Sequence, residues 1–378
     1  MHAHFIISLL VGVQAQRQFV NDYRPGVKSH NTLTSNVTKT NSFFSARASR
    51  LVFEDNFDRL DLKTWRHELT LGGGANWEFQ QYTNNRTISY TKNGILYIKP
   101  GLTSEAIGSE EAVIRGGSID IWGNMPNNEC TSNAYYGCAR SSDGEHILNP
   151  IQSAQLRSFR SFSMKYGKFE VRAKLPRGDW IWPAIWLLPT DHAYGSWPAS
   201  GEIDILESRG NAPGNGGTGN NEMASTLHWG TDFFSNQYER TTASYKLPNG
   251  QSFADDFHTF TLEWNPSSII TRVDDNIVLN VPISDSFWNM GKFSSRLHNP
   301  WDGESKDAPF NQEFNIILNV AIGGTNGYFP EGAGNKPWSN KSPSAAKDFN
   351  NAKNQWFSTW PQDEGRALAI DYIRVWSL

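Results

Sequence analysis

Residues 197–211 read WPASGEIDILESRGN, and this stretch places three carboxylates, Glu202, Asp204 and Glu207, among isoleucines and a leucine. Isoleucine and leucine favour a buried strand, whereas carboxylates are costly to bury. Acids on a strand more often simply face solvent. An apolar strand that carries three of them is also typical of functional sites, which accept desolvation costs that the rest of a fold avoids. The pattern alone leaves both interpretations open.

The spacing of these acids predicts a β-bulge. In a regular strand, residues i and i+2 share a face and residue i+5 points to the other side. Glu202 and Asp204 would then face one way and Glu207 the other. One extra residue near Ile205 or Leu206 would return Glu207 to the face of the other two. The stretch therefore predicts a row of three acids on one concave face, and paired carboxylates beside a cleft are what hydrolysis of a glycosidic bond requires.

Composition is compatible with one large all-β domain or two small ones. The chain has 378 residues, with 34 basic against 38 acidic groups, so no polyanionic partner such as nucleic acid is indicated. The 32 glycines fit a strand-and-turn architecture. The 15 tryptophans fit either a β core or a sugar-binding cleft, and composition does not separate these two.

The N-terminus is typical of a secreted protein. Residues 5–13 (FIISLLVGV) form an apolar run too short to span a bilayer, and small side chains at positions 13 and 15 fit cleavage before Gln16. We therefore expect a signal peptide over residues 1–15 and an extracellular protein. Residues 16–47 are polar and predict a tail, and residues 48–378 form the folded domain. No other apolar run is long enough for a transmembrane helix, so we expect no membrane partner.

The cysteines and sequons agree with this route. Cys130 and Cys138, in CTSNAYYGC, are the two cysteines of the chain and predict one disulfide. A metal site would need further ligands, and His146 is the only candidate nearby. Three N-glycosylation sequons begin at Asn36, Asn85 and Asn340.

Strand patterns dominate the folded domain. Apolar residues occupy every second position of residues 168–175 and 258–264, which predicts strands with one buried face. Residues 314–322 are mostly apolar, as in a strand covered on both sides, and residues 368–376 form a closing strand. Strands at short spacing with Gly, Asn and Pro between them indicate a β-sandwich. A short helix is expected near residues 344–354.

Several separate phrases, in order, resemble glycoside hydrolase family 16, and most closely its invertebrate branch of laminarinases (endo-1,3-β-glucanases) and β-1,3-glucan-binding proteins. Besides the acid row, these phrases are GGANWEFQQYT (73–83), QSAQLRS (152–158), YGKFEVRAKLP (166–176), GDWIWPAIWLLP (178–189), TLHWG (226–230), FHTFTLEW (257–264), LNVAIGG (318–324) and DYIRVW (371–376). The resemblance implies an all-β fold, a concanavalin A-like jelly roll of two bent antiparallel sheets. It also implies that residues 48–378 are a catalytic domain with a cleft across the concave sheet.

The resemblance further assigns roles to the three acids. Glu202 is similar to the nucleophile and Glu207 to the general acid/base of a retaining mechanism, in which the two carboxyls lie about 5–5.5 Å apart. Asp204 would hydrogen-bond Glu202 and tune the charge of the row. Three acids this close cannot all ionise freely, so at least one pKa is expected to rise, and a protonated Glu207 is what general-acid catalysis needs.

Further cleft residues are expected from the same resemblance. His228 matches a position that hydrogen-bonds the substrate or the acids, and the resemblance favours this over the alternative of a core histidine. Seven positions in all are expected to bind substrate: Trp180, Trp182, Trp186, Trp197, His228, Arg157 and Asn76. Some family members hold one structural calcium; Asp371 fits its late ligand, and Asn56 stands where an early acid is usual. No catalytic metal or other cofactor is expected.

The favoured function is secreted, endo-acting hydrolysis of β-1,3-glucan by a monomer. A non-catalytic β-1,3-glucan recognition protein of innate immunity is the alternative, but that branch typically lacks one or both glutamates and carries an additional N-terminal module. Agarases and carrageenases share the bulged ExDxxE spacing, so a galactan substrate is a third interpretation. Mixed-linkage glucanases and xyloglucan transferases generally have the shorter ExDxE.

Overall fold

The computed structural model describes residues 49–123, 129–214 and 218–378. The predicted signal peptide, the polar tail and the sequon at Asn36 lie outside the described residues. No helix within these ranges is long and apolar enough to cross a membrane.

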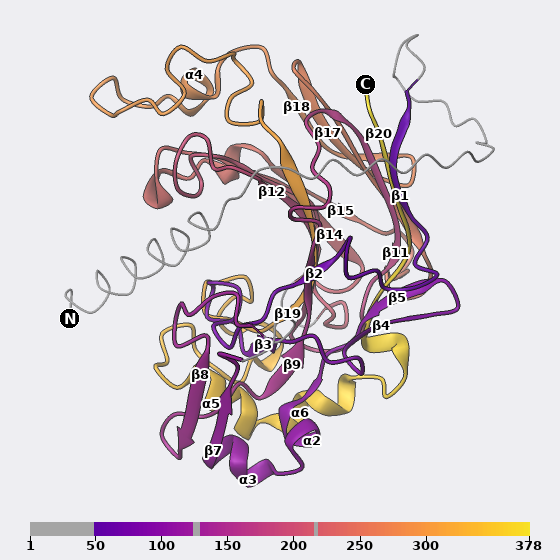
Figure 1. Ribbon diagram of the computed structural model, residues 1–378, viewed down its shortest axis with the longest axis vertical. Coiled ribbons are helices and arrows are strands. Elements are labelled where there is room, and N and C mark those ends of the chain that lie inside the picture. The colour runs from indigo at the N-terminus through magenta and orange to yellow at the C-terminus, as the bar shows by residue number, and fades with distance from the viewer. Residues whose placement is uncertain (1–48, 124–128, 215–217) are drawn as a thin grey trace.

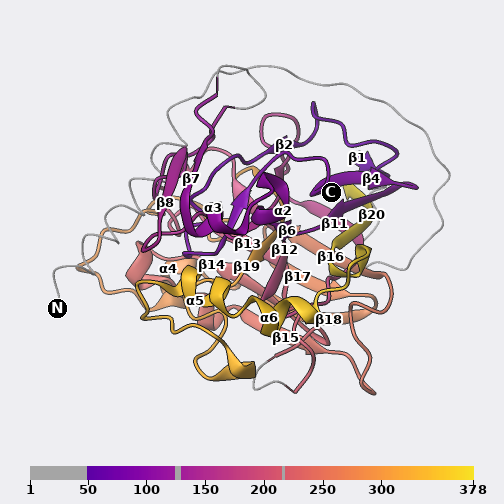
Figure 2. The same ribbon diagram turned by 90° about the horizontal axis from the view of Figure 1, so that it is seen from below.

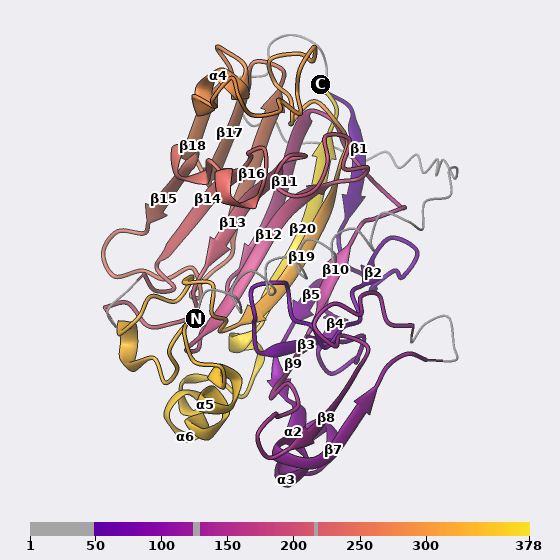
Figure 3. The same cartoon turned by 90° about the vertical axis from the view of Figure 1, so that its left-hand side faces the viewer.

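Two large antiparallel sheets form the body of the molecule (Figure 1). The eight-stranded sheet has the order β18 (Asn276–Pro282), β17 (Ser268–Val273), β16 (His258–Asn265), β11 (Gly167–Lys174), β20 (Leu368–Trp376), β5 (Ile95–Ile98) and β4 (Ser89–Lys92), with β1 (Leu51–Asp55) also paired to β20. The seven-stranded sheet has the order β15 (Thr242–Lys246), β14 (Glu222–His228), β13 (Glu202–Ser208), β12 (Ile181–Pro189), β19 (Phe314–Ile322), β10 (Gln155–Arg157) and β2 (Arg66–His67). Figure 3 shows these seven strands in front of the larger sheet.

Smaller elements lie at the two ends of this sandwich. One end carries a mixed sheet of β3 (Gln80–Tyr82), β9 (Ile151–Ser153) and β6 (Gly101–Leu102), and a hairpin of β7 (Arg115–Asp120) and β8 (Ala139–Asp143). Figure 2 views this end, where four helices gather: α2 (Thr103–Ile107), α3 (Glu110–Ile114), α5 (Ala345–Asn351) and α6 (Lys353–Trp356). The opposite end carries α4 (Phe287–Gly291). Five single 3-10 turns complete the described chain: η1 (Phe233–Ser235), η2 (Tyr238–Arg240), η3 (Ala333–Asn335), η4 (Phe357–Thr359) and η5 (Glu364–Arg366).

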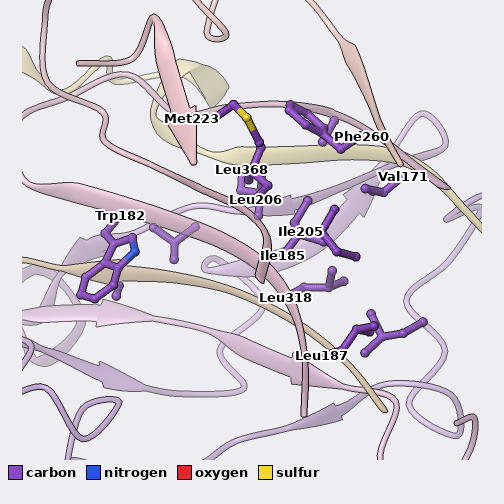
Figure 4. Close-up of a cluster of buried hydrophobic side chains, with 14 of the residues drawn as sticks. Val171, Trp182, Ile185, Leu187, Ile205, Leu206, Met223, Phe260, Leu318 and Leu368 are labelled. Carbon is purple, nitrogen blue, oxygen red and sulfur yellow. The ribbon is translucent and has the colours of Figure 1, made fainter. Parts of the chain in front are cut away.

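The core lies between the two large sheets. Because side chains alternate along a strand, the apolar residues on one face of each strand point into it. On β11, Phe169, Val171 and Ala173 are fully buried while the residues between them are only partly buried. Strand β19 is buried at every position, as its unbroken apolar sequence predicts. Figure 4 shows Val171 and Phe260 from one sheet beside the side chains of Ile185, Leu187 and Leu318 from the other. The predicted strands at 168–175, 258–264, 314–322 and 368–376 and the helix near 344–354 are confirmed.

Candidate active site

The predicted bulge is present in β13. Asp204 pairs with Thr226 of β14 and Glu207 with Ala224, so two β13 residues oppose the single residue Ser225. On the other side, β12 pairs with Asp204 and with Leu206 at consecutive positions, which leaves Ile205 as the inserted residue. The bulge brings Glu207 back to the face of the other two acids.

A hydroxyl relay in the core supports the bulge. The Ser225 hydroxyl donates to the carbonyl oxygen of Ile205 at 2.7 Å and accepts from the Thr271 hydroxyl at 2.8 Å. Ile205 and Leu206 are both fully buried. Because a carbonyl displaced by a bulge would otherwise remain unpaired in an apolar core, this relay satisfies the group that the distortion exposes.

Each glutamate of the row receives an indole N–H. Trp197 Nε1 donates to Glu202 Oε2 at 2.8 Å, and Trp182 Nε1 donates to Glu207 Oε1 at 2.9 Å. Trp197 comes from the loop that precedes β13, and Trp182 from the neighbouring strand β12. The two carboxyls are therefore held by separate donors from separate elements.

His228 lies against the middle of the row. Its Nε2 is 3.2 Å from Asp204 Oδ2 and 3.8 Å from Glu202 Oε1. Its Nδ1 is 2.8 Å from Asn236 Nδ2, and the Oδ1 of that amide accepts from the backbone N–H groups of Trp229 and Tyr238. This fixes the amide so that its NH2 donates to Nδ1, which places the imidazole proton on Nε2, facing Asp204.

Burial and mutual repulsion keep the row from carrying three charges. Burial raises the pKa of Glu202 to about 8, and the Asp204 carboxylate is the second cause. Burial also raises the pKa of Asp204 well above its ordinary value, and its buried Oδ2 forms no hydrogen bond even though His228 Nε2 lies 3.2 Å away. Burial raises the pKa of Glu207, although His228, Trp182 and Arg209 oppose the rise. Protonated carboxyls therefore persist in this row toward neutral pH.

A stack of aromatic and guanidinium planes supports Trp182. The Tyr328 ring lies parallel to the Trp182 indole, with centroids 3.8 Å apart at 7°. The Arg209 guanidinium lies 4.0 Å from the Tyr328 ring centroid, and its Nε donates to the Tyr328 carbonyl at 3.1 Å. The Tyr328 hydroxyl donates to the carbonyl of Ser208 at 3.0 Å. These contacts join β12, the end of β13 and the loop after β19.

The other predicted cleft residues have varied surroundings. Trp186 pairs with Asp204 across the strands, and its Nε1 donates to Asn319 Oδ1 at 2.7 Å. Arg157, on β10, forms an ion pair with Glu68 at 3.6 Å. The Asn76 side chain donates to Glu78 Oε1 at 3.2 Å, in a loop before β3.

Trp180 lies in the core in this structure, and its predicted role in sugar binding stays a prediction. Its side chain is 3% exposed and packs edge-on against Phe329 and Trp338. The backbone of Trp180 is left-handed, with φ of 67°, and β12 begins only at the next residue. The alternation that would have placed Trp180 on the face of Trp182 therefore does not extend to it.

Five residues of the site were not predicted: Arg209, Phe233, Asn236, Tyr238 and Tyr328. Tyr328 lies on a loop that begins where β19 ends, at the Trp182 end of β12, because Trp182 pairs with Ala321. A glycine-rich segment directly after a buried strand was the available signal for it. Tyr238 stacks on His228 with centroids 5.5 Å apart, and no local sequence pattern marks it.

A pocket of about 570 Å³ lies beside Trp197. Its walls come from three loops, at residues 193–199, 231–233 and 297–300. The Phe233 ring is 5.6 Å from the Trp197 ring. The acid row and this pocket therefore share the Trp197 side chain.

Two groups of described residues could be considered as metal sites, and neither fits a metal ion. Glu202, Asp204 and His228 offer ligand atoms within 4.8 Å of one another, but Nε2 carries a proton and Nδ1 accepts from Asn236, so the imidazole has no free lone pair. At the expected calcium site, Asp371 Oδ2 binds Arg172 at 2.6 Å, and Asn56 Oδ1 lies 3.4 Å from a nitrogen of Arg374. Guanidinium groups thus hold the oxygens that calcium would need.

The predicted disulfide is confirmed. Cys130 and Cys138 are bonded, with Cα atoms 5.5 Å apart. The sequons at Asn85 and Asn340 lie at partly buried side chains, and their glycosylation stays a prediction.

Residues 126–313 match the family model described as "Glycosyl hydrolases family 16". A "Beta-1,3-glucan-binding protein" of Penaeus monodon is 50% identical over 334 residues, which are 87% of this chain and 90% of that protein. A "Glucan endo-1,3-beta-glucosidase A1" of Niallia circulans is 31% identical over 72% of this chain and 34% of its own length.

The fold comparison agrees with the sequence comparison. The solved laminarinase of Rhodothermus marinus superposes with a TM-score of 0.53 at 25% identity, covering 88% of this chain and 99% of that one. This likeness shows the jelly-roll architecture that the resemblance implied. Because a relative at 50% identity spans nearly all of the folded domain and the fold agrees, the chain belongs to glycoside hydrolase family 16.

Proposed function

We propose that this protein is a secreted, monomeric endo-hydrolase that cleaves β-1,3-glucosidic bonds of laminarin-like glucans with retention of configuration. One observation supports this most: three acids, one buried and two half-buried, share one strand face, and each terminal glutamate is held by its own indole N–H. A protein that only binds glucan gains nothing from carboxyls that are buried, repel one another and retain protons.

The proposed mechanism requires a row in which Glu207 carries a proton and Glu202 is ionised. Glu207 donates its proton to the glycosidic oxygen while Glu202 attacks the anomeric carbon, which gives a covalent glycosyl-enzyme and releases the first product. Glu207 then accepts a proton from water as that water attacks the anomeric carbon and frees Glu202. The Trp197 N–H stabilises the Glu202 carboxylate, and Asp204 limits the total charge.

The alternative is recognition of β-1,3-glucan without hydrolysis. What favours it is the name of the Penaeus monodon relative, "Beta-1,3-glucan-binding protein". Binding and hydrolysis need the same cleft, so binding alone does not discriminate between them. The intact Glu202, Asp204 and Glu207 favour the enzyme.

Release of reducing sugar from laminarin tests the proposal, with mixed-linkage glucan and agarose assayed beside it. We expect release from laminarin first, and none from Glu202→Gln at equal folding by circular dichroism. If laminarin is bound but no substrate is cleaved, the protein is a recognition protein. Release mainly from agarose would move the substrate to galactans. Secretion is tested by N-terminal sequencing of the protein from culture medium, expected to begin near Gln16, and the monomer by light scattering.

A further inference from the structure

We propose that the pocket beside Trp197 is a binding site for glucosyl units of the same glucan that extends the cleft on the Glu202 side. This inference rests on the proposed function and adds a subsite to it. The pocket is lined by the loops at 193–199, 231–233 and 297–300. Its volume of about 570 Å³ lies within the range of roughly 300–1,000 Å³ typical of small-molecule sites.

The pocket adjoins the acid row through Trp197. The Trp197 indole donates its N–H to Glu202, and the same residue lines the pocket. A glucan whose reacting unit lies at Glu202 would then reach this pocket by passing Trp197. In Figure 1 the segment around α4 and the loop that follows β14 lie close together, at the end of the sandwich opposite the four gathered helices.

The walls offer the apolar faces that sugar rings stack on. Phe233 is 50% exposed, and its ring contacts that of Trp197 at 5.6 Å. Leu297, on the opposite loop, is 45% exposed. Covering half-exposed, large apolar side chains beside a tryptophan with a ligand makes a favourable contribution to the free energy of binding.

Phe233 is held in place from below. Asp232 Oδ1 accepts from the backbone N–H groups of Phe234 and Ser235, and Asp232 Oδ2 accepts from the Thr231 hydroxyl. This capping fixes the turn η1 on which Phe233 lies. The ring is thus presented by a rigid support, which lowers the entropic cost of binding.

The polar groups of the pocket suit a neutral, hydroxyl-rich ligand. The described residues that line it include no lysine or arginine, so they offer an anionic ligand no counter-charge. The His298 imidazole also lines the pocket and makes no hydrogen bond or ion pair with the described residues. Its ring nitrogens are free for a sugar hydroxyl.

Affinity measurements in the inactive Glu202→Gln protein test the site without dependence on turnover. Phe233→Ala is compared with Phe234→Ala, a matched control because Phe234 is adjacent, 80% exposed and does not line the pocket. We expect Phe233→Ala to weaken binding of long laminari-oligosaccharides about fivefold to tenfold, as burial of half a phenyl ring implies, and Phe234→Ala to have no effect. His298→Ala should weaken binding in the same direction.

Two ligand series distinguish the source of the glucosyl units. If the pocket binds the main chain, the loss in Phe233→Ala appears above a threshold length of linear oligosaccharide and is absent below it. If it binds a 6-linked branch, the loss appears only with branched oligosaccharides of equal backbone length. Equal affinities of Phe233→Ala and Phe234→Ala for both series would overturn the pocket, while laminarin hydrolysis by the wild type would still stand. Absence of hydrolysis is the separate outcome that removes the proposed function.

Discussion

At the scale of single residues, Asp204 has the least support for a negative charge. Its buried Oδ2 has His228 Nε2 beside it at 3.2 Å but forms no hydrogen bond, whereas Glu202 and Glu207 each accept an indole N–H. A charge on Asp204 is the second cause, after burial, of the raised pKa of Glu202. Asp204 therefore governs the protonation of the nucleophile, although it need not touch the reacting atoms.

Replacement of Asp204 by asparagine tests this role. We expect Asp204→Asn to lower kcat/KM for laminarin about tenfold, less than the ~10²–10⁴-fold loss that removal of a general acid causes. Because the substitution removes one cause of the raised pKa of Glu202, the acid limb of the pH profile should move to lower pH. Total loss of activity in a folded variant, equal to that of Glu202→Gln, would contradict this role.

At the scale of elements, the stack of Trp182, Tyr328 and Arg209 determines where Glu207 points. Trp182 is only 7% exposed and lies face to face with Tyr328, so little of its ring is free for sugar. Its N–H holds Glu207. Tyr328 and Arg209 are thus positioning residues that act on the acid through Trp182.

Loss of the stack should impair proton donation rather than binding. We expect Tyr328→Leu to lower kcat for laminarin about ten- to a hundredfold, because a displaced acid misses the leaving oxygen. Aryl glycosides with a good leaving group need little proton donation and should be spared. Tyr328→Phe, which keeps the ring, should lie close to wild type. Tyr97→Leu removes a stacked tyrosine outside the site and is the control; equal losses on both substrate classes would indicate general disruption instead.

At the scale of the whole molecule, the acid row should lower the free energy of unfolding as the pH becomes alkaline. A carboxyl whose folded pKa exceeds its unfolded value stabilises the fold below the unfolded pKa, and that contribution is lost as pH rises through the folded pKa. For Glu202 this window runs from its ordinary value of 4.5 to about 8.

Thermal unfolding of Glu202→Gln across this window measures the cost. The variant should match wild type near pH 4 and unfold at a higher temperature than wild type at pH 8. The exposed Glu145→Gln should follow wild type at every pH. A variant whose midpoint does not rise relative to wild type with pH would show that Glu202 is ionised at little cost.

Local pattern predicted much of this molecule and long-range pairing determined the rest. The alternation on β11 and the apolar run of β19 are properties of neighbouring residues, so both strands could be predicted. The bulge could be predicted because only one insertion returns Glu207 to the acid face. Tyr328 could not, since it reaches Trp182 only once β19 pairs with β12, and no local pattern marked the left-handed backbone at Trp180.

The bulge in β13 has a consequence for how the spacing of the three acids can change in evolution. Ile185 pairs with Leu206 and Ala184 with Glu207, while Ile205 faces no residue of its own on β12. Deletion of the Ile205 codon would leave Leu206 directing its side chain inward and Glu207 outward, with every neighbouring pair unchanged. We expect such a protein to fold, at a cost of about 2–5 kcal/mol for the lost buried side chain. A single in-frame codon thus separates the long and short forms of the acid signature, and neither neighbouring strand has to shift its register for the change.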